Sequence, residues 1–455
     1  MSAWQSVILA AGAGIRMRSA TPKVLHQVCG VPLIQHVASA LRDADFKKPI
    51  VVVAPDADGI RTYLGVNVDF AVQETPLGTG HALSCARGKI PDNAENILVI
   101  NADCPLVPSE AIQHLMAVHE DNNADLTLMT TDGVGQEGFG RIVRDASGTL
   151  TAIVEEREAT AEQLTMTEVN GGVYAFRAAT LWPELATLKP SSKGEIYLTD
   201  MVARVHQAQG AIATVHATDS HDVLGVNTRV DLAQAEAVMR GRIQTRHMLD
   251  GVTLIDPSTT YIDTGVLIGK DTVLYPNTHL QGATQVGEAC QIGPNTVLQD
   301  TVVGQRVRIV SSMLEGATLE ADVDVGPFAH LRPGSHIGES THIGNFVEIK
   351  ESTLANGVKV GHFSYLGDAD VGANVNIGAG TVTANFDGVE KHKTTIEENA
   401  FIGSDTMLIA PVLIGKGAAT GAGSVVTKDV TAGETVVGVP ARPQLRKSNK
   451  KPEKV

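Results

Sequence analysis

The sequence predicts an α/β domain with a largely parallel sheet, followed by a parallel β-helix of hexapeptide repeats. Up to about residue 229, short apolar runs alternate with segments of helical periodicity, as in α/β folds. After about residue 251, an aliphatic residue followed by Gly recurs at steps of six, with slips of five. The low aromatic content, 4% of 455 residues, suits this second half, because stacked aliphatic side chains can form its core.

The first half contains three short apolar runs that predict buried strands, over Ile50–Ala54, Ile97–Asn101 and Leu126–Thr130. Helical periodicity covers Pro32–Arg42, and Asp231–Leu249, with a single glycine, predicts a connecting helix at the end of this half. Ligands of such sheets bind at the carboxyl ends of the strands, so we expect a binding site at that edge.

The second half carries its repeat as aliphatic–Gly pairs. Inward aliphatic side chains would stack into one continuous core, with small residues in the tight corners. The stretch between Gly380 and Phe401 interrupts the period, and such interruptions are where loops leave a solenoid to form sites. The aliphatic residues of the pairs are Ile268, Val286, Ile292, Ile337, Ile343, Val360, Leu366, Val371, Ile377, Ile402 and Ile414.

The composition excludes several classes of function. The formal net charge of −15 argues against a protein that coats nucleic acid or binds a membrane surface. No apolar run reaches membrane-spanning length, and the start of the chain lacks a secretion-signal pattern. Cys29, Cys85, Cys104 and Cys290 show no paired spacing, which indicates a reducing compartment and no zinc site. We expect a cytoplasmic protein that neither binds nucleic acid nor inserts stably into a membrane.

The stretch Val7–Arg18, VILAAGAGIRMR, joins an apolar strand to a glycine-containing loop. A dinucleotide-binding fingerprint needs a third glycine three positions later, and a P-loop needs a following Gly-Lys-Ser/Thr; both are missing. Gly12 and Gly14 let backbone N–H groups approach an anion, and Arg16 with Lys23 can neutralise a triphosphate. Taken alone, this loop is equally well a structural turn.

Three further features favour a nucleotide site. A second small-residue loop, Gln73–Ala82 (QETPLGTGHA), can admit a flat base. Asp103 follows the run ILVI at the ligand-binding edge of the sheet, where a carboxylate suits Mg²⁺, although an N-cap or turn role is the alternative. Asn227, within Gly225–Thr228, offers another oxygen ligand near the end of the domain.

Polar side chains gather within a few coils of the predicted β-helix. A lone histidine on a solenoid is usually a solvated surface residue, but His362 stands among arginine, lysine, tyrosine and asparagine. These cationic and amide donors can converge on a sugar phosphate. They are Arg332, Lys350, Tyr365 and Asn376, followed by the run Asn385–Gly388 (NFDG) ahead of Lys391.

The motifs of the first half resemble the sugar-nucleotide pyrophosphorylases. With the hexapeptide half attached, residues 5 to about 430 are similar to the bifunctional bacterial N-acetylglucosamine-1-phosphate uridyltransferases/glucosamine-1-phosphate acetyltransferases. This resemblance implies a Rossmann-like nucleotidyltransferase domain over residues 1–229 and a linker helix over 230–250. It also implies a left-handed β-helix acetyltransferase domain over 251–437 and a basic tail over 438–455. The left hand comes from the resemblance alone, since hexad spacing does not fix it.

The resemblance also implies the residues of the first site. The nucleotide contacts would be Leu9, Ala10, Ala11 and Gly12, with Arg16 and Lys23 on the phosphates and Gln73, Gly78 and Thr79 at the uracil. The sugar contacts would be Gly140, Glu155 and Asn170, each alternatively a turn or strand-end residue, and the Mg²⁺ ligands would be Asp103 and Asn227. The implied reaction is attack of a sugar-1-phosphate oxygen on the α-phosphorus of UTP, catalysed by positioning and charge neutralisation.

In the second site, the resemblance makes His362 the general base for a glucosamine amine that attacks the thioester of acetyl-CoA. The amino-sugar-phosphate contacts would be Arg332, Lys350, Tyr365, Asn376 and Lys391, and the acetyl-CoA contacts Ala379, Asn385, Phe386, Ser404 and Ala422. Phe386 stands where the family often has tyrosine, so a hydroxyl hydrogen bond is lost. Arg442 does not align cleanly with the family's terminal arginine, which leaves its contact to CoA open.

The resemblance predicts an assembly, and two alternative functions remain open. The resemblance implies a homotrimer with acetyl-CoA sites between subunits, so one chain would hold an intact uridylyl site and an incomplete acetyl site. One alternative is a pyrophosphorylase for glucose or mannose phosphate whose β-helix is regulatory or structural; it would need no base at His362. The other is a non-catalytic subunit, which predicts loss of Asp103, Lys23 and His362, yet all three are present.

Overall fold

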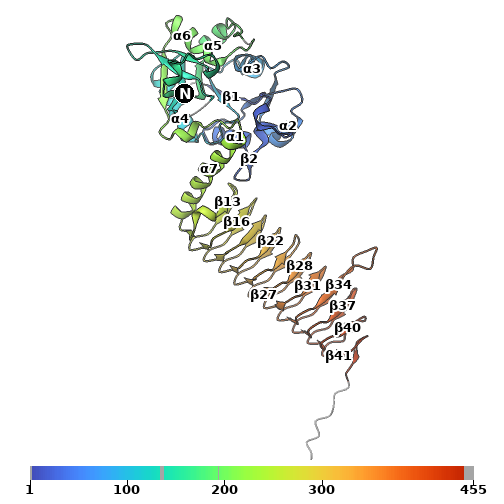
Figure 1. Cartoon of the computed structure of the whole chain (residues 1–455). Coiled ribbons are helices and arrows are strands. Elements are labelled where there is room, and N and C mark those ends of the chain that lie inside the picture. Colours follow the sequence, from blue (N-terminus) through green and yellow to red (C-terminus); the bar gives the residue numbers. More distant parts are fainter. Residues whose placement is uncertain (1–2, 134–137, 193, 445–455) are drawn as a thin grey trace, which may run out of the picture. The chain divides into compact units, whose positions relative to one another are not determined.

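The computed structural model describes residues 3–133, 138–192 and 194–444. They form two compact units that divide between Met239 and Arg240 (Figure 1). The division falls inside helix α7 (Arg229–Leu249), which confirms the helix predicted over 231–249. Within the described part of the chain, no helix is both long and apolar enough to cross a membrane. The tail predicted over 438–455 lies outside the described residues after Gln444.

The first unit is built on a mainly parallel sheet with the order β11-β7-β10-β6-β1-β4-β5. Only β10 runs antiparallel to its neighbours along this path through the described residues, and it also pairs with the β8–β9 ribbon. The bounds are β1 (Trp4–Leu9), β4 (Ile50–Val53), β5 (Asp69–Val72), β6 (Asn96–Asn101), β7 (Leu126–Asp132), β8 (Arg141–Arg144), β9 (Leu150–Val154), β10 (Glu168–Arg177) and β11 (Ile212–His216), with a separate pair β2 (Gln27–Val28) and β3 (Val31–Pro32).

Helices cover both faces of this sheet, which explains why its strands are apolar without alternation. Ile8 belongs to the core cluster that includes α1 and α4, whereas its neighbour Val7 belongs to the cluster that includes α3, α5 and α6. The helix predicted over Pro32–Arg42 is confirmed as α1. The bounds are α1 (Leu33–Asp43), α2 (Asp58–Leu64), α3 (Thr79–Ala86), α4 (Ser109–Asp121), α5 (Ala178–Leu185) and α6 (Met201–Gln207).

The strand order changes direction at β1, which pairs with β4 on one side and β6 on the other. Leu9, the last residue of β1, is the register partner of both Val52 and Asn101. The loops after β1 and β6 therefore leave the sheet together, at the kind of switch point where open α/β sheets bind ligands.

The second unit is a parallel β-helix with three faces (Figure 1), which confirms the hexapeptide prediction. Each strand pairs in parallel with the strand of the same face in the next coil. Face one contains β12 (Thr253–Leu254), β15 (Val273–Leu274), β18 (Gln291–Ile292), β21 (Arg308–Ile309), β24 (Asp324–Val325), β27 (His342–Asn345), β30 (Lys359–His362), β33 (Asn376–Ile377), β36 (Phe401–Ile402), β39 (Ala419–Thr420) and β41 (Thr435–Val437), closed by antiparallel β42 (Arg442–Pro443).

The other two faces follow the same pattern. Face two contains β13 (Tyr261–Ile262), β16 (Thr278–Gln281), β19 (Thr296–Gln299), β22 (Met313–Glu315), β25 (His330–Leu331), β28 (Glu348–Lys350), β31 (Tyr365–Gly367), β34 (Val382–Ala384), β37 (Met407–Ile409) and β40 (Val425–Val426). Face three contains β14 (Leu267–Ile268), β17 (Gln285–Val286), β20 (Val302–Val303), β23 (Thr318–Leu319), β26 (His336–Ile337), β29 (Thr353–Leu354), β32 (Ala369–Val371), β35 (Thr394–Ile396) and β38 (Val412–Ile414).

The hexad repeat holds this unit together through ladders of inward side chains. On face two, Leu314, Leu331, Ile349 and Leu366 are successive register partners, and none of them is exposed to solvent. Burying one such side chain contributes roughly 1.5–3 kcal/mol, so a regular ladder stabilises short strands that have no helices to cover them.

The interruption of the repeat is shorter than the predicted stretch from Gly380 to Phe401. β34 still continues face two and β35 resumes on face three, so only residues 385–393 leave the coil. Figure 1 shows this excursion as a loop beside β34.

Candidate active sites

The switch point of the first unit carries a cluster of opposite charges. Lys23 Nζ lies 2.5 Å from Asp103 Oδ2 and 3.1 Å from Asn227 Oδ1. Arg16 Nη2 donates to the same Asn227 oxygen at 2.9 Å. Because the Lys23 and Asp103 side chains are only 13% and 18% exposed, their attraction is less screened than that of a surface ion pair.

Local structure explains how residues so far apart in sequence meet. Arg16 lies in the short helix η1 (Ile15–Met17), and Lys23 begins η2 (Lys23–Leu25). Gly14 has a φ of +60°, and a Cβ atom there would lie 2.6 Å from the Cβ of Lys23, so this loop requires glycine. Asp103 follows β6, and burial raises the pKa of the Cys104 thiol, which stays protonated and donates to Asp103 Oδ1 at 3.6 Å.

A cavity of about 270 Å³ opens beside this cluster, and a larger one of about 700 Å³ shares part of its lining. Several predicted site residues line the smaller cavity, and two neighbours that sequence reasoning missed, Tyr174 and Thr199, also line it. The predicted residues are Arg16, Thr79, Asp103, Gly140, Glu155, Asn170 and Asn227.

The carboxylate of Glu155, which lines this cavity, has a shifted pKa. Burial raises the pKa of Glu155, and the nearby Asp200, Glu158 and Glu195 raise it further. The hydroxyl of Thr199 donates to Glu155 Oε1 at 2.8 Å, which opposes the rise because it stabilises the charged form. Glu155 is therefore held as a hydrogen-bond acceptor that gains a proton more readily than an ordinary glutamate.

Asn170 and Gly140 lie on paired segments of the same wall. Asn170 Nδ2 donates to the Tyr174 hydroxyl at 2.6 Å, and its Oδ1 accepts from the Gly172 N–H at 3.2 Å, so the amide is fixed. The Asn170 N–H donates to the Gly140 carbonyl at 2.9 Å. A Cβ atom on Gly140 would lie 2.7 Å from Ile153 Cγ2, which leaves no room for a side chain.

The remaining residues predicted for the first site lie on the β1–β4–β5 side of the switch point. Backbone bonds fix the loop after β1: the Ala10 N–H donates to Val52 O at 2.9 Å, and Leu9 O accepts from the Ala102 N–H at 3.0 Å. Gly12 has no atom near the position of a Cβ, so its backbone is open to a ligand. Gln73 and Gly78 lie beside each other, with Gln73 Nε2 donating to Gly78 O at 3.0 Å.

The donors of the first site fit a magnesium ion. Asp103 Oδ2 and Asn227 Oδ1 both lie within hydrogen-bond distance of the same Lys23 ammonium, so two oxygens converge on one point. Mg²⁺ accepts one or two protein oxygens and retains waters. The described residues contain no group of three or more His, Cys, Asp or Glu arranged for a metal ion.

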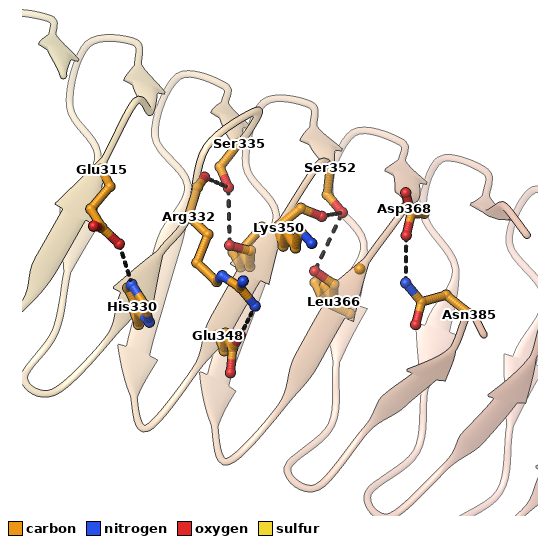
Figure 2. A network of polar contacts seen from close by, with 12 residues as sticks. Glu315, His330, Arg332, Ser335, Glu348, Lys350, Ser352, Leu366, Asp368 and Asn385 are labelled. Carbon is orange, nitrogen blue, oxygen red and sulfur yellow. Dashed lines mark hydrogen bonds and ion pairs between the residues drawn. The ribbon is translucent and has the colours of Figure 1, made fainter. Parts of the chain in front are cut away.

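In the second unit, Arg332 and Lys350 lie on neighbouring coils where β25 and β28 end (Figure 2), and Lys391 of the loop 385–393 approaches Lys350. Arg332 and Lys350 follow each other in register on successive coils, and Arg332 Nη1 donates to Glu348 Oε1 at 2.9 Å. The Lys391 ammonium, and then the Arg332 guanidinium, lower the pKa of Lys350. Glu348 neutralises Arg332 in part, and the three neighbouring cations together form a site suited to a phosphate. Tyr365 lies on the same face in the next coil.

His362 ends strand β30 and belongs to a row of aligned residues at the corner between faces one and two. The register Val360–Ile377–Ile402 aligns it with Ala379 and Ser404 in the next two coils, and the next pairing extends the row to Ala422. On the other side its register partner is Asn345, whose Oδ1 lies 2.5 Å from His362 Nδ1.

The hydrogen bond to Asn345 determines where His362 carries its proton. The asparagine oxygen can only accept, so Nδ1 is the protonated nitrogen of the neutral ring and Nε2 keeps its lone pair. This leaves Nε2 as the basic atom of an exposed imidazole.

The loop 385–393 carries the other predicted residues. Asn385 Nδ2 donates to Asp368 Oδ2 at 2.5 Å, and Phe386, which is 60% exposed, forms a bridge with Lys391. Asp387 orders the turn: its carboxylate accepts from the backbone N–H groups of Val389 and Glu390 at 2.8 Å and contacts His392 Nε2 at 2.7 Å.

The predicted residue Asn376 lies away from these clusters within one chain, and so does Arg442, whose contact to CoA the sequence left open. Asn376 begins β33, where its partners are Lys359 and Phe401, three residues before the corner row at Ala379. Arg442 belongs to the antiparallel strand β42 and donates from Nη1 to the Ala441 carbonyl at 3.0 Å.

Comparison with known proteins gives the family. Residues 6–208 match the MobA-like NTP transferase domain, and residues 393–428 match the bacterial transferase hexapeptide repeats. A protein named "Bifunctional protein GlmU" from Heliobacterium modesticaldum is 45% identical over 433 residues, which cover 95% of this chain and 94% of the relative. One of the same name from Brevibacillus brevis is 42% identical over 458 residues, covering 100% and 99%. This chain belongs to the GlmU family. A third relative of that name, from Mycolicibacterium gilvum, is 44% identical over 447 residues, 96% of this chain and 89% of its own.

Membership of the GlmU family accounts for the two separate clusters, one in each unit of this chain. The positioning residues Thr199, Tyr174 and Asn345 were not found from sequence. The sequence does hold a signal that could have identified Asn345. It lies 17 residues before His362, which is close to one coil of three hexads with a slip of one residue. Thr199 and Tyr174 had none, since their contacts depend on the packing of separate segments.

Proposed function

We propose that this protein, as a GlmU-family enzyme, makes UDP-N-acetylglucosamine, a precursor of the cell wall, in two steps. The second unit transfers an acetyl group from acetyl-CoA to glucosamine-1-phosphate. The first unit transfers a uridylyl group from UTP to the resulting N-acetylglucosamine-1-phosphate and releases pyrophosphate. The observation that carries this proposal is the pairing of a charge-lined cavity in one unit with a basic histidine and a cation cluster in the other.

In the acetyl step, Arg332, Lys350 and Lys391 bind the sugar phosphate, with Tyr365 and Asn376 as further contacts. His362 Nε2 takes a proton from the amine while the nitrogen attacks the thioester carbon. The carbon–sulfur bond then breaks, and the CoA thiolate leaves and becomes protonated. Asn345 holds the imidazole in the tautomer that this step requires. Ala379, Asn385, Phe386, Ser404 and Ala422 line the path of acetyl-CoA.

In the uridylyl step, an oxygen of the sugar-1-phosphate attacks the α-phosphorus of UTP, and the bond to the departing pyrophosphate breaks. The substrate phosphate is already ionised, so the protein supplies no nucleophile. Arg16 and Lys23 neutralise the charge that develops on the phosphates, while Leu9, Ala10, Ala11 and Gly12 hold the nucleotide. Gln73, Gly78 and Thr79 recognise uracil, and Gly140, Glu155 and Asn170 hold the sugar.

We assign Mg²⁺ to Asp103 and Asn227, where it would stabilise negative charge on the α-phosphate. The convergence of both oxygens on Lys23 Nζ supports this assignment, because a cation already occupies that point. Lys23 is then free to move from these two oxygens to a phosphate.

We propose a cytoplasmic homotrimer in which a neighbouring chain completes the acetyl site. Two observations support it. Asn376 is aligned with Lys359 at the start of β30, whereas His362 lies at the end of that strand. A row of exposed phenylalanine side chains also lies next to His362 in the sequence and in the two preceding coils. Phe328, Phe346 and Phe363 stack at 5.4 and 5.1 Å between ring centroids, each at least 51% exposed. Light scattering would find a three-chain mass, and a monomer with full acetyl transfer would contradict the proposal.

The function is tested by two assays on the same preparation. Thiol release from acetyl-CoA with glucosamine-1-phosphate reports the acetyl step, and pyrophosphate release from UTP with N-acetylglucosamine-1-phosphate reports the uridylyl step. Both signals are expected. Pyrophosphate release without thiol release would instead identify a single-activity pyrophosphorylase with a structural β-helix.

The raised pKa of Glu155 predicts that uridylyl transfer weakens at low pH, a change called here the acid limit. The ionised carboxylate of Glu155 accepts hydrogen bonds from sugar hydroxyls more strongly than the protonated acid does. KM for the sugar phosphate should therefore rise as the pH falls through this raised pKa, and it should begin to rise at a higher pH than for an ordinary glutamate. Thr199→Val removes the bond that opposes the shift and should move the limit to higher pH. Glu155→Gln should abolish the rise of KM at low pH. The substrate's own titration is the same for the wild type and both variants, so the differences between their pH profiles report on Glu155. An acid limit that persists in Glu155→Gln would contradict this assignment.

A further inference from the structure

The side-chain amide of Gln73, which the proposed function puts at the nucleobase, is held in one orientation. Gln73 follows β5 and is only 5% exposed. Its Nε2 lies 3.0 Å from the carbonyl oxygen of Gly78. A carbonyl oxygen only accepts hydrogen bonds, so the NH₂ end of the amide must face it.

The acceptor at Gly78 is itself rigid. Gly78 has a φ of +101°, and a Cβ atom there would lie 2.5 Å from the Ile196 carbonyl. Its oxygen also accepts the Ala82 N–H in the first turn of α3, at 3.0 Å. The backbone around it is fixed by Ile196, whose N–H donates to Leu77 O at 2.7 Å and whose oxygen accepts from the Gly80 N–H at 2.9 Å.

The second N–H of the Gln73 amide is used by a histidine that the proposed reaction leaves unassigned. Gln73 Nε2 lies 2.9 Å from His81 Nδ1. Because Nε2 is the donor, His81 Nδ1 must carry the lone pair, and the imidazole proton must be on its Nε2. That nitrogen faces Cys85 Sγ at 3.9 Å. The chain Gly78–Gln73–His81 is therefore compatible with one amide orientation and one neutral tautomer.

With both N–H groups used, the oxygen is the part of the amide that is left to bind a ligand. No group in the described part of the chain donates to Gln73 Oε1. We propose that His81 is a positioning residue that fixes Gln73 Oε1 as a base acceptor and so makes the site select uracil over cytosine. This inference rests on the proposed function, in which Gln73 faces the nucleobase.

The selectivity follows from the edges of the two bases. Uracil carries an N–H at N3, which an amide oxygen can accept, whereas cytosine carries a lone pair at N3, which the same oxygen opposes. A turned amide would reverse this preference by presenting its NH₂ group. Sites that hydrogen-bond a substrate group reject an analogue lacking it, because their own polar group is left unpaired.

The test compares kcat/KM for UTP and CTP with N-acetylglucosamine-1-phosphate. His81→Leu removes the acceptor at Nδ1 and should lower the UTP/CTP ratio by roughly tenfold, the worth of about one hydrogen bond. His81→Asn can place an amide oxygen near the position of Nδ1 and should retain most of the ratio. If His81 served only the stability of the fold, its loss would lower kcat/KM for UTP and for CTP by the same factor. An unchanged UTP/CTP ratio in His81→Leu would therefore overturn the proposal. A fall of the ratio in His81→Asn as large as that in His81→Leu would also overturn it.

Cys85→Ala is the matched control, because it changes the partner of the other ring nitrogen on the same helix. Its ratio should stay at the wild-type value. Acetyl transfer by the second unit, followed as thiol release, checks that each variant is folded.

A measurement that needs no activity separates this inference from the proposed function. In ¹⁵N-histidine-labelled full-length protein, the His81 resonances, assigned by their absence in His81→Asn, should show an unprotonated Nδ1 and a protonated Nε2. A proton on Nδ1 would overturn the inference even if the enzyme were active. The expected tautomer in a protein that used neither UTP nor CTP would overturn the proposed function instead.

Discussion

The His362→Ala variant is expected to lose acetyl transfer by roughly 10²- to 10⁴-fold, the usual contribution of a general base, while its uridylyl transfer stays at the wild-type rate. The reason lies in the bond from Nδ1 to Asn345 Oδ1, which leaves the Nε2 lone pair as the only basic site of the ring. Thiol release and pyrophosphate release from one preparation measure both rates. His336→Ala is the matched control, since this outward histidine of the same β-helix pairs with Glu320 at 2.9 Å on face three.

A second substitution separates the base from the residue that orients it. Asn345→Leu should lower kcat for acetyl transfer by roughly tenfold, because it removes one hydrogen bond but keeps the imidazole. KM for glucosamine-1-phosphate should change little, since Asn345 is not among the proposed phosphate contacts. If His362→Ala retained most of its thiol release, the base would have to be sought elsewhere. If Asn345→Leu raised only KM, Asn345 would bind substrate rather than orient His362.

The sequence was most informative where a local pattern decides structure. Runs such as ILVI predict strands buried on both faces, and their polar ends predict the edge at which Asp103 lies. The hexads predict a β-helix because each inward residue repeats its neighbour's environment one coil later. The family resemblance, rather than the hexad count, selected His362, Ala379, Ser404 and Ala422, and the register of the strands aligns these four residues at one corner of successive coils.

Contacts made between segments with no common period could not be predicted. The bond from Thr199 to Glu155 spans 44 residues and depends on how η7 (Leu198–Asp200) packs against the end of β9. Tyr174 reaches Asn170 only because the register of β10 against β7 shifts between these two residues. The bonds that orient Gln73 likewise require the fold of the loop before α3, although the residues themselves lie in the predicted base-binding stretch.

Asp103→Asn is expected to give the largest loss of uridylyl transfer, roughly 10²- to 10³-fold, with acetyl transfer unchanged. The amide has nearly the shape of the carboxylate but lacks the negative charge that holds both Lys23 and the proposed Mg²⁺. The pair is mostly buried, so the lost charge is not replaced by solvent. Asp69→Asn is the matched control, because its partner Lys48 lies 2.8 Å away in an exposed ion pair that should contribute little.

The two roles of Asp103 are separable by titrating Mg²⁺. If the carboxylate binds the ion, Asp103→Asn should need more Mg²⁺ for half-maximal pyrophosphate release, and excess Mg²⁺ should restore part of the rate. If it only positions Lys23, the loss should be independent of Mg²⁺ and should be matched by Lys23→Met. A variant with the wild-type rate and the wild-type Mg²⁺ requirement would contradict both roles, and the thermal midpoint of the first unit would show whether the pair serves stability instead.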